Sequence, residues 1–156
     1  MLIVKKPSEN DILKALKILE QSQYDVSCVY CGDKMTEWDH LYPLVKGKYP
    51  TGYIIEISNL VPACGKCNQS KGNSDWKEWI LSNATLSPNS KRTKNLHKRI
   101  RLIEKYEIEF KKTKLNLEEY AGSDLWQEYW MQYEKVIYEM RKAQTIMDQI
   151  KQKNPN

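Results

Sequence analysis

The chain has 156 residues, of which 40% are hydrophobic and 29% are charged, and its formal net charge is +5. This length suits one domain with an extension, and the composition is that of a folded chain rather than a disordered one. No run of about 18 apolar residues is present, so we expect no transmembrane segment and no membrane partner. The apolar stretch at residues 2–4 is too short for a secretory signal peptide, which predicts a cytoplasmic protein.

The positive charge is concentrated in one block of the chain. Residues 1–90 hold ten basic and ten acidic residues, residues 91–114 hold ten basic and three acidic, and residues 115–156 hold five basic and seven acidic. The middle block therefore suits a surface that faces a polyanion. A charge run is more often only a solvated helix face, so this block alone identifies no partner.

The expected elements begin with a helix over residues 9–22. Ser8 suits its N-cap, Asp11 stands three residues later as in a capping box, and apolar residues follow at helical spacing. Between residues 28 and 67, frequent Gly and Pro leave room only for short strands, which we expect at 36–41 and 53–60. A short helix from Gly65 to Lys71 and a second one after the cap Ser74 complete this part.

Helices are expected in the rest of the chain. After a loop at 82–90, residues 91–114 predict a basic helix, and a longer amphipathic helix begins at Asp124. Its apolar stripe must be buried on something, and packing on the basic helix or on a second copy of the chain are both open. The sequence thus predicts a core at residues 1–90, which includes the N-terminal helix, and a helical extension at residues 91–156.

The four cysteines form two pairs, Cys28-x-x-Cys31 and Cys64-x-x-Cys67, and none is left over. Four thiolates are the ligand set of a closed, structural zinc site, and each CxxC turn points both sulfurs at one ion. In a cytoplasmic protein, cysteines are expected as thiols or metal ligands rather than disulfides. The pattern therefore predicts structural Zn²⁺, with an insertion between the two knuckles.

The insertion carries residues suited to phosphodiester hydrolysis, which needs a base for water and a cation for the charge on the leaving oxygen. The adjacent pair Asp39-His40 can divide this work. Asp39 and Asn68 offer hard oxygen ligands, which suit Mg²⁺ or Mn²⁺. Lys71, one helical turn after Asn68, could touch a phosphate.

These segments resemble the HNH endonuclease family. The resemblance rests on Asp39-His40, Asn59-Leu60-Val61-Pro62 and Cys64-x-x-Cys67-Asn68-x-x-Lys71 between CxxC knuckles, from about Cys28 to Asn73. It implies an α+β fold, the ββα-metal (HNH) nuclease core stapled by a four-cysteine zinc site, with an N-terminal helix and C-terminal helices beside it. It also implies that His40 is the general base, Asp39 and Asn68 are ligands of the catalytic metal, and Asn59 braces the loop that carries the base.

The nucleic-acid contacts are expected from basic side chains of the core and of the basic helix. Residues 1–90 contain no arginine, so phosphate contacts in the core would fall to lysines. The expected contact residues are Lys46, Lys48, Lys66, Lys71, Arg92, Lys98, Arg99 and Arg101.

The resulting hypothesis is a metal-dependent endonuclease that cuts double-stranded DNA, such as a restriction or phage-defence enzyme. A homing or nicking enzyme, an RNA-directed nuclease and a non-catalytic zinc module that only binds nucleic acid are the alternatives. One metal site cuts one strand, so a double-strand break requires a dimer or two visits. The apolar stripe after Asp124 is the candidate surface for a homodimer.

Overall fold

The computed structural model describes residues 3–153. It divides into two compact units, Met1–Leu115 and Asn116–Asn156. The sequence predicted a boundary at residue 90 instead. The difference arises because the basic helix contributes Ile103 and Tyr106 to the hydrophobic core of the first unit.

The first unit begins with helix α1 (Glu9–Ile18), which confirms the expected N-terminal helix in a shorter form. The Ser8 hydroxyl accepts a hydrogen bond from the Asp11 amide, and the Asp11 carboxylate accepts one from the Ser8 amide. This capping box satisfies amides that the first helical turn leaves unpaired. Ala15 and Leu16 are buried, so α1 covers one side of the core.

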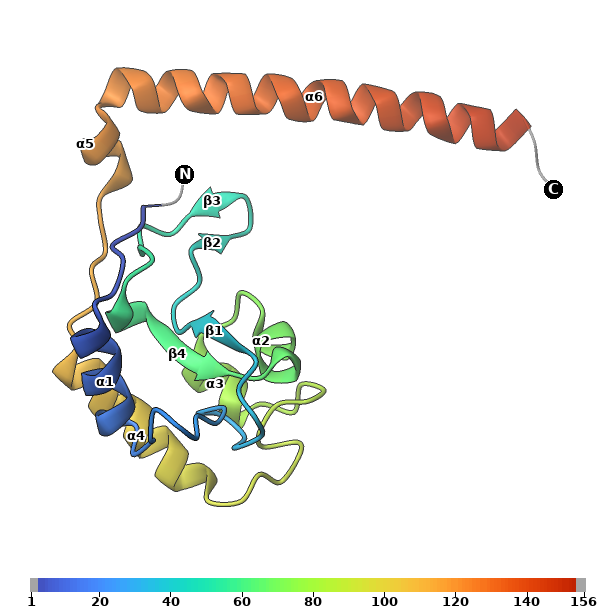
Figure 1. Cartoon of the computed structure of the whole chain (residues 1–156). Coiled ribbons are helices and arrows are strands. Elements are labelled where there is room, and N and C mark those ends of the chain that lie inside the picture. Colours follow the sequence, from blue (N-terminus) through green and yellow to red (C-terminus); the bar gives the residue numbers. More distant parts are fainter. Residues whose placement is uncertain (1–2, 154–156) are drawn as a thin grey trace. The chain divides into compact units, whose positions relative to one another are not determined.

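The centre of the first unit is an antiparallel pair of strands, β1 (Glu37–His40) and β4 (Leu60–Ala63), shown in Figure 1. Asp39 faces Val61 and His40 faces Leu60 in its register. The strand β1 matches the predicted 36–41. A second small hairpin joins β2 (Val45–Lys46) to β3 (Tyr49–Pro50), and Gly47 in its turn has a positive φ of 62°.

The prediction of a second strand at residues 53–60 is wrong. Tyr53 and Ile55 form only isolated bridges, to Lys114 and Val4, and a 3-10 helix η1 (Ile57–Asn59) follows. Burial does alternate along this segment, but it falls on Ile54, Glu56 and Ser58, whereas Tyr53, Ile55 and Ile57 are only half-buried. The strand itself is displaced to Leu60–Ala63, where Pro62 is tolerated because β4 has a partner on one side only.

Two short helices follow β4. Helix α2 (Gly65–Lys71) ends at Gly72, whose φ of 49° confirms the predicted stop. Helix α3 (Trp76–Leu81) is capped by Asp75, which accepts from the amides of Lys77 and Glu78, rather than by Ser74 as predicted. Trp76 and Trp79 are buried in the core.

The basic helix α4 (Leu96–Glu109) is shorter than the predicted 91–114 and lies against α1 (Figure 1). The buried Tyr106 hydroxyl contacts the carbonyl oxygens of Ile57 and Leu60. This contact ties α4 to the start of β4, and so to the strand pair that positions the site.

The second unit contains α5 (Leu117–Ala121), which the sequence did not predict, and the long helix α6 (Ser123–Lys153). Asn116 caps α5, and Gly122 with a positive φ of 81° separates the two helices. Helix α6 confirms the predicted amphipathic helix. Among the described residues, no helix combines the length and the apolar character needed to cross a membrane.

Candidate active site

The four cysteines converge at one point, with all four sulfur atoms within 4.8 Å of one another. Cys28 and Cys31 come from the loop before β1, whereas Cys64 and Cys67 come from the start of α2. Hydrogen bonds with Cys31 and Cys67 lower the pKa of the Cys28 thiol, whereas hydrogen bonds with Cys28 and Cys31 raise that of Cys67. The cluster is compatible with a tetrahedral zinc site, as the spacing predicted.

The first knuckle is clamped by an arginine from outside the core sequence. The Arg99 guanidinium, on α4, donates to the backbone oxygens of Cys28 at 3.3 Å and Val29 at 3.4 Å. We expected Arg99 to contact nucleic acid, but its guanidinium instead donates hydrogen bonds to backbone carbonyls of the protein itself. No sequence signal distinguishes it from the other arginines of the basic helix.

Three of the predicted catalytic residues line one pocket. Asp39 and His40 reach it from β1, and Asn68 reaches it from the middle of α2. The other lining residues are Pro43, Leu44, Val45, Gly72 and Asn73. Asn73 directly follows the turn that ends α2 and was not among the predicted site residues.

The Asp39 carboxylate is buried, with 3% of the residue exposed, and is held from one side. The Tyr30 hydroxyl donates to Oδ2 at 2.7 Å, and the Lys71 ammonium lies 3.3 Å from the same oxygen. Burial raises the pKa of Asp39, and the Lys71 charge opposes this shift. Neither contact uses Oδ1. Tyr30, which stands between the two cysteines of the first knuckle, was not among the predicted site residues.

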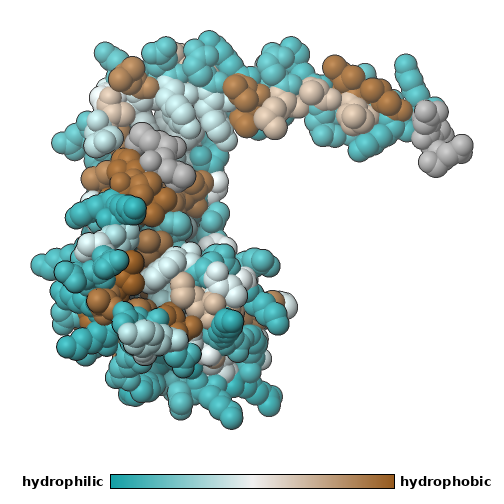
Figure 2. Space-filling view, in the orientation of Figure 1, coloured by the Kyte–Doolittle hydropathy of each residue, from teal (hydrophilic) through white to brown (hydrophobic). Residues whose placement is uncertain are grey.

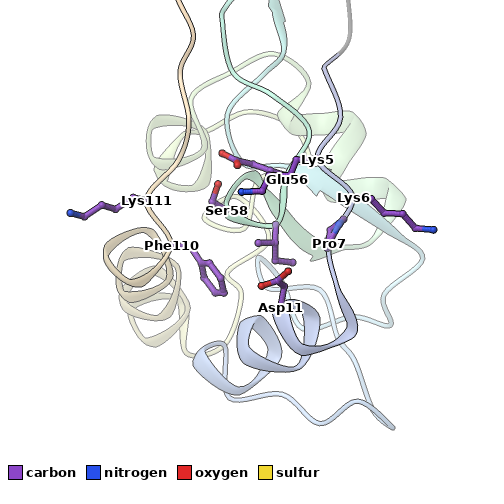
Figure 3. A pocket seen from close by; sticks show the side chains of 9 residues that line it. Lys5, Lys6, Pro7, Asp11, Glu56, Ser58, Phe110 and Lys111 are labelled. Atoms are coloured by element: carbon purple, nitrogen blue, oxygen red, sulfur yellow. The ribbon is translucent and has the colours of Figure 1, made fainter.

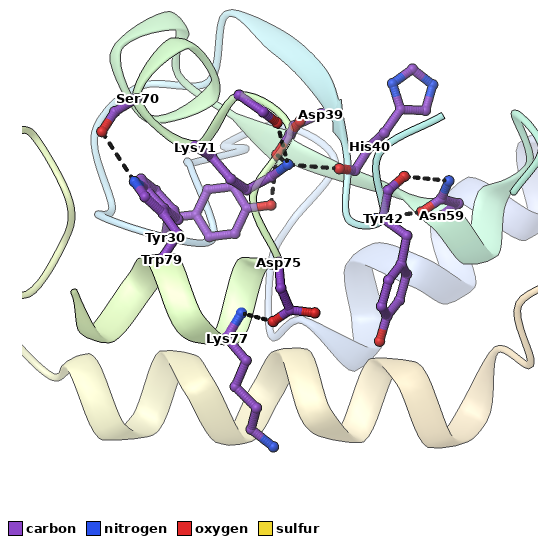
Figure 4. Close-up of polar contacts among 11 residues, drawn as sticks. Tyr30, Asp39, His40, Tyr42, Asn59, Ser70, Lys71, Asp75, Lys77 and Trp79 are labelled. Atoms are coloured by element: carbon purple, nitrogen blue, oxygen red, sulfur yellow. Dashed lines mark hydrogen bonds and ion pairs between the residues drawn. The ribbon is translucent and has the colours of Figure 1, made fainter. Parts of the chain in front are cut away.

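His40 is the last residue of β1 and directly follows Asp39 (Figure 4). Its Nε2 atom is buried and has no hydrogen-bond partner within residues 3–153. Burial lowers the pKa of His40, and the nearby positive charge of Lys71 adds to this effect. The ring is therefore neutral at physiological pH, which is the form that accepts a proton.

Asn59 does not line the pocket but fixes the loop that follows His40. Its Oδ1 accepts from the Tyr42 amide at 2.7 Å, and its Nδ2 donates to the Tyr42 carbonyl at 3.1 Å (Figure 4). The same Nδ2 donates to the Ile54 carbonyl at 3.2 Å. Asn59 is 1% exposed, so no water competes for these groups. The geometry matches the bracing position that the resemblance implied.

Lys71 occupies a different place from the one predicted. Its side chain is 1% exposed, and its ammonium donates to the His40 carbonyl at 2.9 Å and contacts Asp39. It therefore joins α2 to the end of β1 from inside the protein, where it cannot meet a phosphate. The prediction that Lys71 contacts nucleic acid is wrong in this structure.

The remaining predicted contact residues are on the surface. Lys46 and Lys48 lie on the β2–β3 hairpin, beside the pocket residue Val45, and Lys66 lies on α2. Lys98 pairs with Glu20 at 2.7 Å. Arg92 and Arg101 are also exposed.

A further cationic cluster lies two residues beyond His40. Tyr42 and Tyr53 stack with ring centroids 4.8 Å apart. The Lys112 ammonium lies 3.6 Å from the Tyr42 ring centroid, and that of Lys114 lies 5.4 Å from the Tyr53 ring. Both lysines belong to the basic block of the sequence, but neither was among the predicted contact residues. Their position directly after α4 was the available signal.

A separate pocket lies on the side of η1 and α1 (Figure 3). Lys5, Lys111, Glu56 and Asp11 place both charge signs around it, and Glu56 accepts from the Thr113 amide at 2.6 Å. None of Asp39, His40 and Asn68 lines this pocket, so it is separate from the pocket at the end of β1.

Two comparisons with known proteins match part of the chain. Residues 28–74 match the family model of the HNH endonucleases. The chain is 35% identical over 78 residues to the CRISPR-associated endonuclease Cas9 of Corynebacterium diphtheriae. This match covers 47% of the chain but only 6% of that relative. No solved structure gives a significant match. Together with the cysteine cluster and the ββα arrangement of β1, β4 and α2, the family match identifies residues 28–74 as an HNH endonuclease domain.

Proposed function

We propose that the chain is a metal-dependent endonuclease that hydrolyses phosphodiester bonds in double-stranded DNA, with His40 as the general base. The observation that carries this proposal is the meeting of Asp39, His40 and Asn68 in one pocket. A base and two oxygen ligands in a shared pocket are what metal-assisted hydrolysis of a phosphodiester requires.

The residues present fit a hard divalent cation. Asp39 and Asn68 offer a carboxylate and an amide oxygen, which suit Mg²⁺ or Mn²⁺ better than softer metals. Tyr30 and Lys71 both contact Asp39 at its Oδ2, so the carboxylate is held in one orientation. When bound, the cation would stabilise the negative charge that develops on the leaving oxygen.

His40 is suited to take a proton from water. Its lowered pKa keeps the imidazole neutral, and its buried Nε2 has no partner in the described residues that would occupy it. Two contacts fix its backbone: Lys71 donates to its carbonyl, and Asn59 binds the loop two residues later. This support holds the base in a defined geometry, on which general-base catalysis depends.

The cysteine cluster is proposed to hold structural Zn²⁺. Four thiolates fill a tetrahedral zinc ion and leave no open position for water, so this ion would stabilise the fold rather than take part in hydrolysis. The cluster joins the loop before β1 to the start of α2, and so links the two elements that carry Asp39, His40 and Asn68.

The DNA backbone is proposed to contact exposed lysines next to the pocket. Lys46, Lys48 and Lys66 lie on the elements that line or flank it, whereas Arg92, Lys98 and Arg101 would extend the contact along the α4 side. Such contacts position the backbone without reading sequence. A restriction or phage-defence role suits these features, with a homing or nicking enzyme as the alternative role.

A non-catalytic zinc module that only binds nucleic acid is the competing function. Asn68 distinguishes the nuclease from the binding module, because a binding module has no use for a hard-metal ligand beside a neutral histidine. The test incubates wild type and Asn68→Ala with supercoiled plasmid in Mg²⁺, in Mn²⁺ or with chelator. We expect wild type to nick only with added metal and Asn68→Ala to need more metal for the same rate. Binding of DNA by the wild type without cleavage under any of these conditions would support the binding module instead.

A further inference from the structure

Helix α6 is a long helix with an apolar stripe, yet none of its residues is buried. It spans 31 residues, which corresponds to about 46 Å. Hydrophobic residues gather along it (Figure 2), and Met140, for example, is 63% exposed. Because helices in proteins are stabilised mainly by packing of an apolar face, a helix of this kind requires a partner surface.

The spacing of its apolar residues specifies the kind of partner. From Trp126 to Ile150, eight residues recur at alternating steps of three and four, which is the heptad period of 3.5, and Trp130, Met131, Ile137, Tyr138 and Ile146 lie outside this stripe. The first position of each heptad is Trp126, Tyr133, Met140 and Met147, and the fourth position is Tyr129, Val136, Ala143 and Ile150. An unbroken 3.5-residue period is the pattern of a helix that packs along another helix as a coiled coil.

We propose that α6 pairs with α6 of a second copy of this chain, in the antiparallel direction. In an antiparallel pair, first positions of one helix face fourth positions of the other. Four kinds of layer result, each occurring twice by symmetry: Trp126 with the partner's Ile150, Tyr129 with the partner's Met147, Tyr133 with the partner's Ala143, and Val136 with the partner's Met140.

Side-chain size favours this direction. In a parallel pair each residue meets its own copy, so Trp126, Tyr129 and Tyr133 would crowd three aromatic layers at one end, and Ala143 would leave a gap towards the other. In the antiparallel pair every aromatic residue meets an aliphatic one, and Ala143 meets Tyr133. Close packing without voids or strain requires such alternation of large and small residues.

The charges of α6 favour the same direction. Residues 123–138 carry three acidic and one basic residue, whereas residues 139–153 carry two acidic and four basic ones. Antiparallel pairing places the acidic half of each helix beside the basic half of its partner. Parallel pairing places halves of the same charge sign beside each other. Glu139 alone would meet its own copy near the centre, and its carboxylate is paired with Lys142 at 2.9 Å. The second copy is therefore a complementary partner in both shape and charge.

The first test measures the mass of the full chain by sedimentation over a concentration series. This test does not depend on nuclease activity. We expect twice the 18.4 kDa of one chain. Val136→Glu, at a core position, should lower the mass to that of one chain, whereas Tyr138→Glu, on the outer face, should leave the dimer intact. Both residues are exposed in the single chain, at 58% and 62%, so neither change disturbs its core. A wild type that stays monomeric, or equal behaviour of the two variants, would overturn the proposal.

The second test determines the direction by oxidative cross-linking. Tyr133→Cys and Ala143→Cys chains are prepared separately and also mixed so that subunits exchange, with wild type as the control for the native cysteines. We expect a cross-linked dimer in the mixture and none in either variant alone. Cross-linking of Ala143→Cys with itself would show a parallel pair, and a dimer that cross-links in no sample would place the interface elsewhere. Either result overturns the antiparallel pairing.

Discussion

The Lys71 ammonium donates a 2.9 Å hydrogen bond to the backbone carbonyl of His40, from a side chain that is 1% exposed. The same ammonium lies 3.3 Å from the Asp39 carboxylate. One cation from α2 thus fixes the backbone of the proposed base and orients the proposed metal ligand. Because Lys71 and Asp39 are both buried, removal of either charge would leave the other charge buried without its ion-pair partner.

Replacing Lys71 should therefore destabilise the domain. In Lys71→Met the buried Asp39 charge loses its ion pair, and removal of one partner of a buried pair costs roughly 3–5 kcal/mol. Urea unfolding followed by circular dichroism measures this loss. Lys66→Met, an exposed position on the same helix, is the matched control and should change stability by no more than about 0.5 kcal/mol. Equal, small effects of the two substitutions would show that Lys71 is not a structural cation.

Asn59 and Ser58 offer a comparison between neighbouring buried polar residues. Asn59→Ala removes three hydrogen bonds and leaves the Tyr42 and Ile54 backbone groups unpaired, at a cost of about 1–3 kcal/mol for each buried group. The Ser58 hydroxyl has no partner within residues 3–153, so Ser58→Ala should be neutral or slightly stabilising. Thermal unfolding of both variants tests the difference. Equal losses at the two positions would contradict the bracing role of Asn59.

Removal of zinc should unfold the first unit. Structural zinc contributes about 10–16 kcal/mol to the folding of small zinc domains, more than the stability of most domains. We expect one zinc per chain by elemental analysis, loss of secondary structure with a strong chelator, and recovery when zinc is restored. Cys64→Ala should bind no zinc and remain unfolded. A chelated chain that keeps its circular dichroism spectrum would contradict a structural role for the cysteine cluster.

The sequence predicted most of the site because its residues are fixed by local patterns. Each CxxC turn brings its two sulfurs together, and Asp39-His40 and Asn68 fall on elements whose positions follow from those turns. It misplaced Lys71, because helical spacing puts Lys71 on the same face as Asn68 but does not say that this face also packs against β1. Sequence spacing does not show how two elements pack, and so it does not show which groups a side chain reaches across their interface.

The second strand and the role of Arg99 show the same limit. Alternating apolar residues at 53–60 resemble a strand, but only contacts with Val4 and Lys114 decide that this segment is bridged outside the sheet. Arg99 lies 71 residues after Cys28, and its bond to the Cys28 carbonyl depends on how α4 docks on the core. Long-range packing, rather than local propensity, determines both features.

The lowered pKa of His40 predicts the pH dependence of cleavage. The neutral imidazole is the base, so protonation removes activity as the pH falls through the pKa of His40. Burial and the Lys71 charge hold that pKa below its usual 6.5, so cleavage should persist at pH 6.5 and be lost at lower pH. The rate is measured at saturating metal, so that protonation of Asp39 contributes little. His97→Ala is the control and should leave the profile unchanged; an acid limb above pH 6.5 would contradict the burial of the base.

The most direct test of the account is the cleavage rate of His40→Ala compared with wild type. Both proteins are first shown to contain zinc and to have the same circular dichroism spectrum, and both are then incubated with supercoiled plasmid and Mg²⁺ or Mn²⁺. A positioned general base accelerates a reaction by about 10² to 10⁴ fold, so the variant should be slower by that factor while it still binds DNA. A folded, zinc-loaded His40→Ala protein that cuts as fast as wild type would contradict the assignment of His40 as the base.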